Sequence, residues 1–551
     1  MKREKILLAC ALIVMVSVVV IQSLLIYQAN GGKFIYPLDD AYIHLTIARN
    51  IATDGIWGVN AGEFAPASSS LIYPLLLAFC QKYITTSELA PLVINLLSDI
   101  AILFLIYIVA IRYSLSITKS AILYFGIIFF TPLPAVTISG MEHTLQIAID
   151  LLYIFLCLSI LSKPDKPAGR ELVFFAIVSA MVSGIRYEGL FLIALFSVFL
   201  ITRRQYRTAL LGLCCGLLPI VVFGLYSVSM GGYFIPYSVL TKGQVPTISF
   251  NGIRQFLIIW SIRFCSAGMA YKFTSAQHLL MLTVFVICSL FIGNKRNISE
   301  NSINIGATVF VYAVFIHTMF AKFGYFYRYE AYLVASGLMI GMIAIKDIRF
   351  KLRSVNGVLF ILVCIGLSIP LFARGIQALD QTVQAGRNVY EQQFQMAQFV
   401  RTYYNNEVVA LNDIGAVSFF TNSKIVDLCG LANKEVFEMK RANKFHKDEI
   451  DRCVHARRAK LAIIYDSWFM GMVPTGWSKV GEWRIDHNVI CGSPTVSFYA
   501  FDKGDADVLS ERLLAFSTGA KKAVMQVRIY QRDEHDDQSS YTITTPLVLD
   551  R

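Results

Sequence analysis

Long apolar segments recur along the first two-thirds of the chain, separated by short polar segments. Eleven of them have the length and composition that favour membrane-spanning helices. We expect spanning helices at residues 6–27, 90–111, 120–136, 143–162, 171–185, 189–202, 208–229, 278–294, 303–321, 330–345 and 355–373. The first follows a basic start, but its apolar core of about 20 residues lacks a small-residue cleavage site, so we expect an uncleaved helix rather than a signal peptide.

A further apolar stretch, Leu71 to Phe79, is too short to span a bilayer comfortably and contains Pro74. We therefore predict a juxtamembrane or re-entrant segment on the outer face. With the amino terminus inside, the inner loops then hold seventeen basic residues, whereas the much longer outer loops hold ten. This asymmetry follows the positive-inside rule, and it places the carboxyl-terminal region outside the membrane.

The region after the last predicted span has the pattern of a soluble domain. Residues 407–412 and 460–465 are short apolar runs typical of buried strands, and residues 389–404 show helical spacing of apolar positions. The segment with Asp533, Glu534, Asp536 and Asp537 is expected to be a solvated loop. The sequence thus predicts a polytopic α-helical membrane domain at residues 1–374 and an extracytoplasmic soluble α/β domain at residues 375–551.

Composition agrees with this division, since 56% of the residues are hydrophobic and only 16% are charged. The formal net charge of +12 arises in the membrane half: residues 1–374 hold 28 basic and 15 acidic residues, against 21 and 22 in residues 375–551. Loop charges that set orientation explain this surplus, so we expect no nucleic-acid partner. A periplasmic tail could pair two of Cys429, Cys453 and Cys491, and the odd number leaves the choice open.

Under this topology, the unusual polar residues of the membrane half gather on its outer side. They are Asp39, Asp40, His44, Arg49, Glu142, His143, Arg186, Glu188, Lys242 and Arg328. Charged groups at a membrane boundary carry a desolvation cost, which makes them candidates for a functional site. Their convergence on one face predicts an active site there.

Asp39 and Asp40 directly follow the first hydrophobic helix and precede a predicted short helix that Gly55 ends. Asp40 and His44, four residues apart, share a side of that helix. A structural explanation is available, because Asp39 could be an N-cap and Asp40 a favourable acid of the first turn. An acidic pair followed by a histidine at a membrane entrance favours a functional role.

The other charged residues also allow two explanations. Ser139 could cap a helix with Glu142 completing a capping box, and Arg186 could form a salt bridge with Glu188. An arginine at the outer surface also suits a lipid-linked phosphate, because a guanidinium binds phosphate oxygens bidentately. Arg328 and Lys242 are similar candidates, with snorkelling to lipid headgroups as the alternative.

Glycosyl transfer from a lipid-phosphate sugar is a reaction that uses both acidic residues and cations at the outer face of a membrane. A carboxylate deprotonates the acceptor hydroxyl, and cations stabilise the departing phosphate. Such a donor needs no nucleotide site, and the sequence shows neither a Gly-x-x-x-x-Gly-Lys loop nor a strand-linked Gly-x-Gly-x-x-Gly motif.

Several short motifs occur in order along the membrane half: Asp39-Asp-Ala-Tyr-Ile43, Ala48-Arg-Asn50, Gly58-Val-Asn60, Ser68-Ser-Ser70, Ser139-Gly-Met-Glu142 and Arg186-Tyr-Glu-Gly189. With them the chain resembles the GT-C superfamily of polyprenyl-phosphate-sugar-dependent glycosyltransferases, and within it the arabinofuranosyltransferase-like branch of bacterial envelope enzymes. The resemblance implies an acidic catalytic-base motif in the first outer loop, juxtamembrane helices in that loop, and inverting transfer.

The resemblance extends to the soluble region, where residues 412–415 and 426–431 are similar to an outer-face domain of some such proteins. Two positions depart from the branch: His143 replaces a frequent Thr, and Tyr187 replaces a Pro between Arg186 and Glu188. These departures concern the sugar and acceptor more than the reaction type.

We therefore expect an inverting glycosyltransferase in the bacterial inner membrane that moves a sugar from a polyprenyl-phosphate donor to an envelope glycan, lipid or protein. Asp39 or Asp40 would be the general base, and Arg186, Arg328 or Lys242 would hold the phosphate. His44, Arg49, Glu142, His143 and Glu188 would position donor and acceptor. Asp40, His44 and Glu142 could also bind a divalent cation such as Mg²⁺, Mn²⁺ or Ca²⁺, which the sequence does not require.

Two other classes of function remain open at this stage. A transporter or lipid flippase would place charges along a pathway near the middle of the bilayer and often shows repeat symmetry, and the sequence has no convincing internal repeat. A catalytically silent scaffold would tolerate neutralisation of Asp39 and Asp40.

Overall fold

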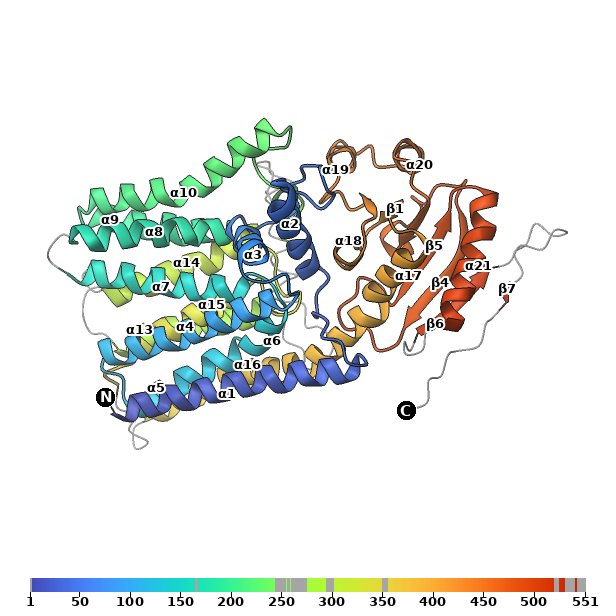
Figure 1. Cartoon of the computed structure of the whole chain (residues 1–551). Helices are drawn as coiled ribbons and strands as arrows, with labels where there is room; N and C mark the ends of the chain where they lie inside the picture. The colour runs from blue at the N-terminus through green and yellow to red at the C-terminus, as the bar shows by residue number, and fades with distance from the viewer. Residues whose placement is uncertain are drawn as a thin grey trace.

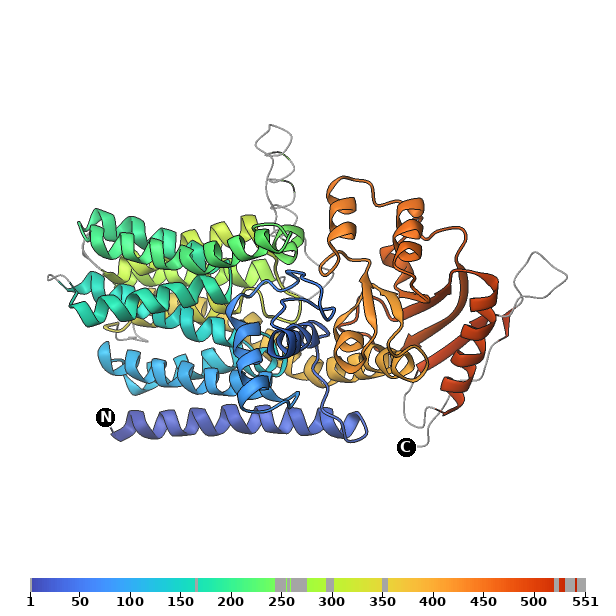
Figure 2. The same cartoon turned by 45° about the horizontal axis from the view of Figure 1, so that its top comes forward.

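The computed structural model describes residues 2–163, 167–242, 254, 258, 275–293, 302–348, 355–519, 525–530 and 541–542. Helices packed along a common direction form a bundle, and a mixed α/β domain lies at one end of it (Figure 1). The start of α2 and the end of α16 both lie at that end, and the chain enters the α/β domain through α16 (Figure 2).

Each of the eleven predicted spans falls on helical structure. The bundle helices are α1 (Lys2–Ala29), α4 (Ala90–Arg112), α5 (Ile117–Phe125), α7 (His143–Ser162), α8 (Gly169–Ile185), α9 (Gly189–Thr202), α10 (Tyr206–Ser229), α13 (Ser275–Gly293), α14 (Ser302–Phe320), α15 (Ala331–Ala344) and α16 (Val355–Val389). Among the described helices, five are long and apolar enough to cross a membrane: α1, α4, α7, α10 and α14. The prediction of a polytopic helical membrane protein is confirmed.

The predicted span at residues 120–136 is wrong in its continuity. Helix α5 ends in a π-helical turn, η1 (Gly126–Phe130), and a separate helix α6 (Leu133–Ile138) follows. Pro132 and Pro134 lack the N–H groups that a continuous helix needs, so the hydrogen-bond ladder breaks between the two helices.

Short helices lie between the bundle and the α/β domain. Helix α2 (Asp40–Asp54) ends as predicted at Gly55, whose φ of 71° is a left-handed conformation that glycine adopts without strain. Helix α3 (Ile72–Tyr83) covers the predicted juxtamembrane segment and packs on α2. Its outer side carries Leu75 and Phe79, which are about half exposed. Another short helix among the described residues is α11 (Tyr237–Lys242).

The connection to the α/β domain is helical. Helix α16 passes the predicted domain boundary at residue 374 and runs to Val389, where a π-helical turn, η2 (Tyr390–Phe394), leads into α17 (Gln395–Tyr403). The predicted helix over residues 389–404 is thus the end of a much longer helical run.

The α/β domain contains a seven-stranded sheet within the described residues, in the order β2-β1-β3-β5-β4-β6-β7. The strands are β1 (Val408–Leu411), β2 (Lys424–Asp427), β3 (Leu461–Ile464), β4 (Ser478–Ile485), β5 (Thr495–Ala500), β6 (Met525–Tyr530) and β7 (Tyr541–Thr542). β1 pairs in parallel with β2 and β3, and the remaining pairs are antiparallel. Both predicted strands are confirmed as β1 and β3.

Four helices complete the domain: α18 (Gly415–Phe420), α19 (Lys434–Arg441), α20 (Lys447–Ala456) and α21 (Lys503–Gly519). The buried ring of Phe399 in α17 packs on Trp483 and Phe498 of the sheet, with ring centroids 5.6 and 5.5 Å away. Cys429, Cys453 and Cys491 are free thiols. The predicted acidic loop with Asp533 to Asp537 lies outside the described residues.

The first outer loop and the α/β domain share one hydrophobic core. Tyr42 and Trp57 of the loop region belong to the same buried apolar cluster as Phe394 and Val417. Tyr42 lies against Phe420, with ring centroids 5.2 Å apart. The loop that carries the acidic pair is therefore packed against the α/β domain as well as against the bundle.

Candidate active site

The carboxylate of Asp40 lies at the junction of bundle and α/β domain and forms an ion pair with Arg328. The Oδ2 atom of Asp40 is 2.6 Å from Nη2 of Arg328. The Asp40 side chain is 26% exposed, whereas that of Arg328 is 1% exposed. The Asp40 carboxylate is therefore held in a fixed direction by Arg328 and still reaches solvent.

Asp39 binds the α/β domain instead of Arg328. Its Oδ2 accepts a hydrogen bond from the backbone N–H of Gly415 at 2.6 Å, and its Oδ1 accepts one from the N–H of Ala416 at 2.7 Å. Its side chain makes no capping hydrogen bond to α2, so the capping explanation of Asp39 is wrong. The two neighbouring acids thus bind different parts of the molecule. The Asp39 carboxylate, which could have capped α2, binds the backbone of the α/β domain instead.

Glu142 is fully buried beneath this junction and joins two other predicted residues. Its Oε1 is 2.9 Å from Nη1 of Arg186, and its Oε2 is 3.3 Å from Nε2 of His44. The capping explanation of Glu142 is also wrong, because its side chain makes no capping bond at the start of α7. His44 in turn lies 3.4 Å from the hydroxyl of Ser68 through its Nδ1 atom.

Arg186 stands at the centre of a buried hydrogen-bond network. Besides Glu142, it donates to both carboxylate oxygens of Glu188, at 3.1 and 2.6 Å, and to the hydroxyl of Ser69 at 2.7 Å. The salt bridge with Glu188 that the sequence offered as a structural explanation is present. Two carboxylates therefore already neutralise the charge of this guanidinium.

Arg328 lies on a loop with unusual backbone geometry. Tyr325, Phe326 and Tyr327 have φ values of 45°, 63° and 62°, which side-chain-bearing residues adopt only at a cost in conformational energy. Behind them, the Glu330 carboxylate accepts from the N–H of Gly324 at 2.8 Å and forms a buried ion pair with Arg374. These contacts of Glu330 stabilise the strained loop.

The Arg328 guanidinium keeps unused donors. Its Nε and Nη1 atoms are buried and have no hydrogen-bond partner among the described residues. The rings of Tyr325 and Tyr329 lie on it, each with its centroid 4.9 Å from the guanidinium carbon. A buried cation with free N–H groups beside an accessible carboxylate is suited to an anionic ligand.

Three other predicted residues have different surroundings. His143 is buried with its ring edge-on to Tyr329, and neither ring nitrogen has a hydrogen-bond partner among the described residues. Arg49 donates to the carbonyl oxygens of Ser418 and Phe419 in α18, at 2.9 and 2.8 Å. Lys242 ends α11, and its side chain lies outside what the structure describes.

The residues predicted as a possible metal site are engaged elsewhere. Asp40 pairs with Arg328, whereas His44 and Glu142 pair with each other. Within the described part of the chain, no group of three or more His, Cys, Asp or Glu side chains is arranged to hold a metal ion. The structure thus does not bring Asp40, His44 and Glu142 together as a three-ligand set.

A carboxylate that sequence reasoning missed comes from the α/β domain. Asp413 lies two residues before Gly415, and its Oδ2 accepts from the hydroxyl of Tyr465 at 2.7 Å and from Nε2 of Gln393 at 2.9 Å. Burial raises the pKa of Asp413 above its ordinary value, and the negative charge of Asp40 raises it further. The motif at residues 412–415 was visible in the sequence, but its contact with the first outer loop was not.

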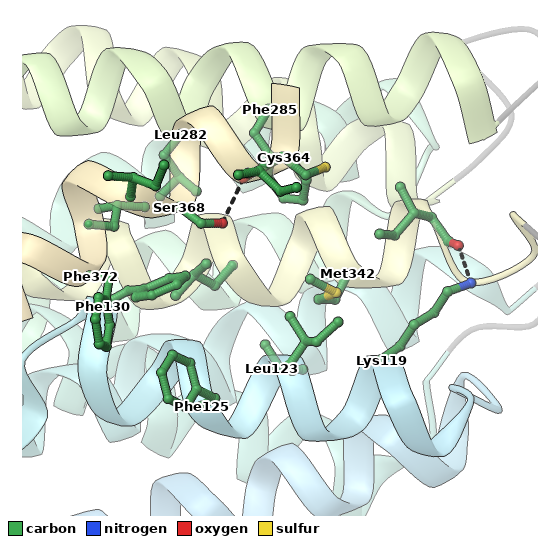
Figure 3. A pocket seen from close by; sticks show the side chains of 16 residues that line it. Lys119, Leu123, Phe125, Phe130, Leu282, Phe285, Met342, Cys364, Ser368 and Phe372 are labelled. Atoms are coloured by element: carbon green, nitrogen blue, oxygen red, sulfur yellow. Dashed lines mark hydrogen bonds between the residues drawn. The ribbon is translucent and has the colours of Figure 1, made fainter. Parts of the chain in front are cut away.

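A largely apolar cavity of about 630 Å³ lies between α5, α13, α15 and α16. Figure 3 shows Lys119 at one end of it, Phe130 and Phe372 at the other, and Leu123 and Met342 between them. Lys119 is held away from the cavity centre by donating to the carbonyl oxygens of Ile345, Lys346 and Ile348.

Hydrogen bonds connect the Phe130 end of the cavity to the loop that carries Arg328. The carbonyl oxygen of Phe130 accepts from Nη1 of Arg374 at 3.1 Å, and Nη2 of Arg374 donates to the carbonyl oxygen of Tyr327, the neighbour of Arg328, at 3.3 Å. One arginine therefore links the wall of the apolar cavity to the loop that carries Arg328.

Comparison with solved structures shows the architecture to which this arrangement belongs. ArnT from Cupriavidus metallidurans, solved bound to undecaprenyl phosphate, matches with a TM-score of 0.51 at 10% sequence identity, covering 89% of this chain and 98% of ArnT. The chain shares the fold of ArnT. At this identity the likeness extends to the fold, and it agrees with the predicted architecture of a multi-pass helical membrane protein.

Other comparisons add less. The arabinofuranosyltransferase AftD from Mycobacteria gives a TM-score of 0.42 at 12% identity, covering 89% of this chain and 40% of AftD. A family model described as a domain of unknown function, DUF8728, matches residues 386–499. A search of curated proteins finds no significant match. The matched domain includes Asp413 and the α18 backbone that binds Asp39.

Proposed function

We propose that this protein is an inverting glycosyltransferase that moves a sugar from a polyprenyl-phosphate donor to a cell-envelope glycan, lipid or protein. The observation that carries the proposal is the pair of Asp40 and Arg328, an accessible carboxylate beside a buried guanidinium with unused donors. The fold supports it, because ArnT, which shares that fold, was solved with undecaprenyl phosphate bound.

In this proposal Asp40 is the general base. Its carboxylate takes the proton of the acceptor hydroxyl as the acceptor oxygen bonds to the anomeric carbon of the sugar. The bond from that carbon to the phosphate oxygen breaks on the opposite face, so the configuration inverts. The electron pair leaves with the polyprenyl phosphate, and the proton remains on Asp40.

Arg328 is the candidate that best fits the leaving phosphate. Its buried Nε and Nη1 groups can donate to phosphate oxygens, and negative charge that develops there gains most from a fixed donor in a desolvated site. Arg186 is already neutralised by Glu142 and Glu188, so we assign it the role of holding Glu142 and His44 in place.

The apolar cavity is our candidate for the prenyl chain. Its lining is almost wholly hydrophobic, and its Phe130 end is linked through Arg374 to the loop of Arg328. A donor with its phosphate at Arg328 could therefore place its chain between α5 and α16. Burial of the prenyl methylenes would supply binding free energy that does not depend on the sugar.

We also propose that the site faces the outside of a bacterial inner membrane, with the amino terminus in the cytoplasm. Support comes from the excess of basic residues in the loops at the other end of the bundle. Reporter fusions after Arg374 test this orientation directly, since a reporter active only in the cytoplasm would contradict it.

The experiment that tests the proposed reaction compares cells with the protein, without it, and with Asp40→Asn. Mass spectrometry of lipid-linked sugars and envelope glycans is the measurement. We expect one polyprenyl-phosphate sugar to accumulate in the last two strains while one glycan loses a residue. Unchanged glycans and unchanged lipid-linked sugars in both strains would contradict the proposal. A flippase would instead change the distribution of the lipid between leaflets, and a catalytically silent scaffold would tolerate Asp40→Asn.

A further inference from the structure

Helix α18 of the α/β domain is held by α2 at both of its ends. Asp39 accepts from the N–H groups of Gly415 and Ala416 at its start, and Arg49 donates to the carbonyl oxygens of Ser418 and Phe419 at its end. These bonds satisfy main-chain groups that a short helix leaves without partners of its own.

A third contact continues along the same outer loop. The side-chain amide of Asn60 both donates to the carbonyl oxygen of Ile425, at 3.0 Å, and accepts from its N–H, at 2.8 Å. Ile425 lies in β2 at the edge of the sheet, so Asn60 binds the backbone of that edge strand as a neighbouring strand would. The three contacts, from Asp39, Arg49 and Asn60, are called the clasp below.

The clasp leaves almost no space between the start of α2 and the start of α18. A Cβ atom added at Gly415 would lie 2.0 Å from the carbonyl oxygen of Asp39, which is far inside van der Waals contact. Only glycine therefore fits there without moving the start of α2.

The start of α2 also carries the proposed base. Asp39 and Asp40 are adjacent, and while Asp39 is fixed to the α/β domain, Asp40 turns to Arg328 of the bundle. Any shift of α18 relative to the bundle would move the peptide between these two residues. The direction of the Asp40 carboxylate thus depends on the position of the α/β domain.

We propose that the α/β domain, through the clasp, is the device that positions Asp40, and that Asp39 is a positioning residue rather than the base. This inference rests on the proposed function and gives a role to the domain matched at residues 386–499. It also explains why a catalytic carboxylate can sit on a loop and still keep a fixed direction.

The test uses the full-length purified protein and measures transfer from a polyprenyl-phosphate sugar. Asp39→Asn, Asn60→Ala and Gly415→Ala should each lower kcat by about ten- to a hundredfold, as expected of small misplacements, while donor KM changes little. Because the base remains, the Asp39→Asn variant should keep the acid limb of the wild-type pH–rate profile. Combining Asp39→Asn with Asn60→Ala should cost less than the product of the two single effects, since both contacts belong to the same clasp and act on the same positioning of Asp40.

A matched control is Asn433→Ala, which removes a side-chain bond to the N–H of Val436 in the same domain but touches no part of α2 described here. It should leave kcat unchanged. The inference is overturned if Asp39→Asn abolishes transfer at every pH as completely as Asp40→Asn. It is also overturned if Asn60→Ala and Gly415→Ala leave kcat at the wild-type value.

Hydrogen exchange separates failure of the clasp from failure of the proposed function. If the clasp exists, Asp39→Ala and Asn60→Ala increase exchange at the amides of residues 415–416 and 425, whatever reaction the protein catalyses. Increased exchange without any glycosyl transfer by the wild type would retain the clasp and reject the glycosyltransferase. Unchanged exchange in both variants would reject the clasp.

Discussion

At the residue scale, the central observation is that two neighbouring aspartates have different partners. Asp39 is tied to two backbone N–H groups of α18, whereas Asp40 pairs with a guanidinium and remains partly exposed. The sequence offers no means of telling them apart, because both belong to one acidic motif. The distinction arises from residues more than 280 positions away in the chain, Arg328 and Gly415.

Arg328 gives the first prediction. Arg328→Gln should lower kcat by about ten- to a thousandfold, because a desolvated donor at the leaving phosphate is lost. Arg328→Lys should recover part of this loss, since it restores the charge but not the planar set of donors. Steady-state kinetics with a polyprenyl-phosphate sugar measures both effects.

Arg484→Gln, at an exposed position of β4, is the matched control and should be neutral. Wild-type rates for Arg328→Gln would show that this residue does not bind the phosphate.

Asp413 gives a prediction about pH. Burial and the nearby Asp40 raise its pKa, so the folded protein holds this proton to a higher pH than the unfolded chain does. As pH rises through the window between the ordinary aspartate pKa of about 4 and the raised value, this group therefore reduces stability. Asp413→Asn should remove that contribution.

Thermal unfolding in detergent across pH 4 to 8 is the measurement. For each protein, the change in stability between pH 4 and neutral pH is compared. This change should be more favourable for the Asp413→Asn variant, because in the wild type the ionisation of Asp413 reduces stability as pH rises. Parallel curves for the two proteins would show that Asp413 does not titrate in this way.

At the element scale, the sequence predicted where the helices lie better than where they begin, break and end. Apolar length alone placed the spanning helices, because the bilayer sets that length. The break between α5 and α6 was predicted wrongly, and the run of α16 past residue 374 was not predicted. The alternative explanation of Asp39 and Glu142 as capping residues is also wrong, since distant partners bind both carboxylates.

The cavity between α5, α13, α15 and α16 gives a prediction at this scale. Met342→Trp should fill part of it, so that transfer from long-chain polyprenyl donors slows while transfer from a short-chain analogue changes little. The ratio of kcat/KM values for the two donors is the measurement.

The matched control places the same bulky ring on a lipid-facing position of α10, as Val221→Trp, and should leave the ratio unchanged. An equal fall for both donors in Met342→Trp would indicate general damage rather than a prenyl site.

At the scale of the whole molecule, the division into membrane bundle and α/β domain could be predicted, but their shared core could not. Hydropathy marks where a segment lies relative to the bilayer, and short apolar runs revealed β1 and β3. The packing of Tyr42 on Phe420 and the bonds of Asn60 to Ile425 join segments more than 360 residues apart, which no local pattern encodes. The candidate site was therefore predicted as a set of residues on one face, whereas its internal pairing came from the structure.

The account as a whole depends on Asp40 acting as the base in transfer from a lipid-phosphate sugar. The most direct measurement is the release of free polyprenyl phosphate, together with glycosylated acceptor, by the purified protein and by its Asp40→Asn variant. We predict equal amounts of the two products from the wild type, and a rate reduced by about a hundred- to ten-thousandfold in the variant. Full activity of Asp40→Asn, or no release of polyprenyl phosphate by an active wild type, would contradict the account.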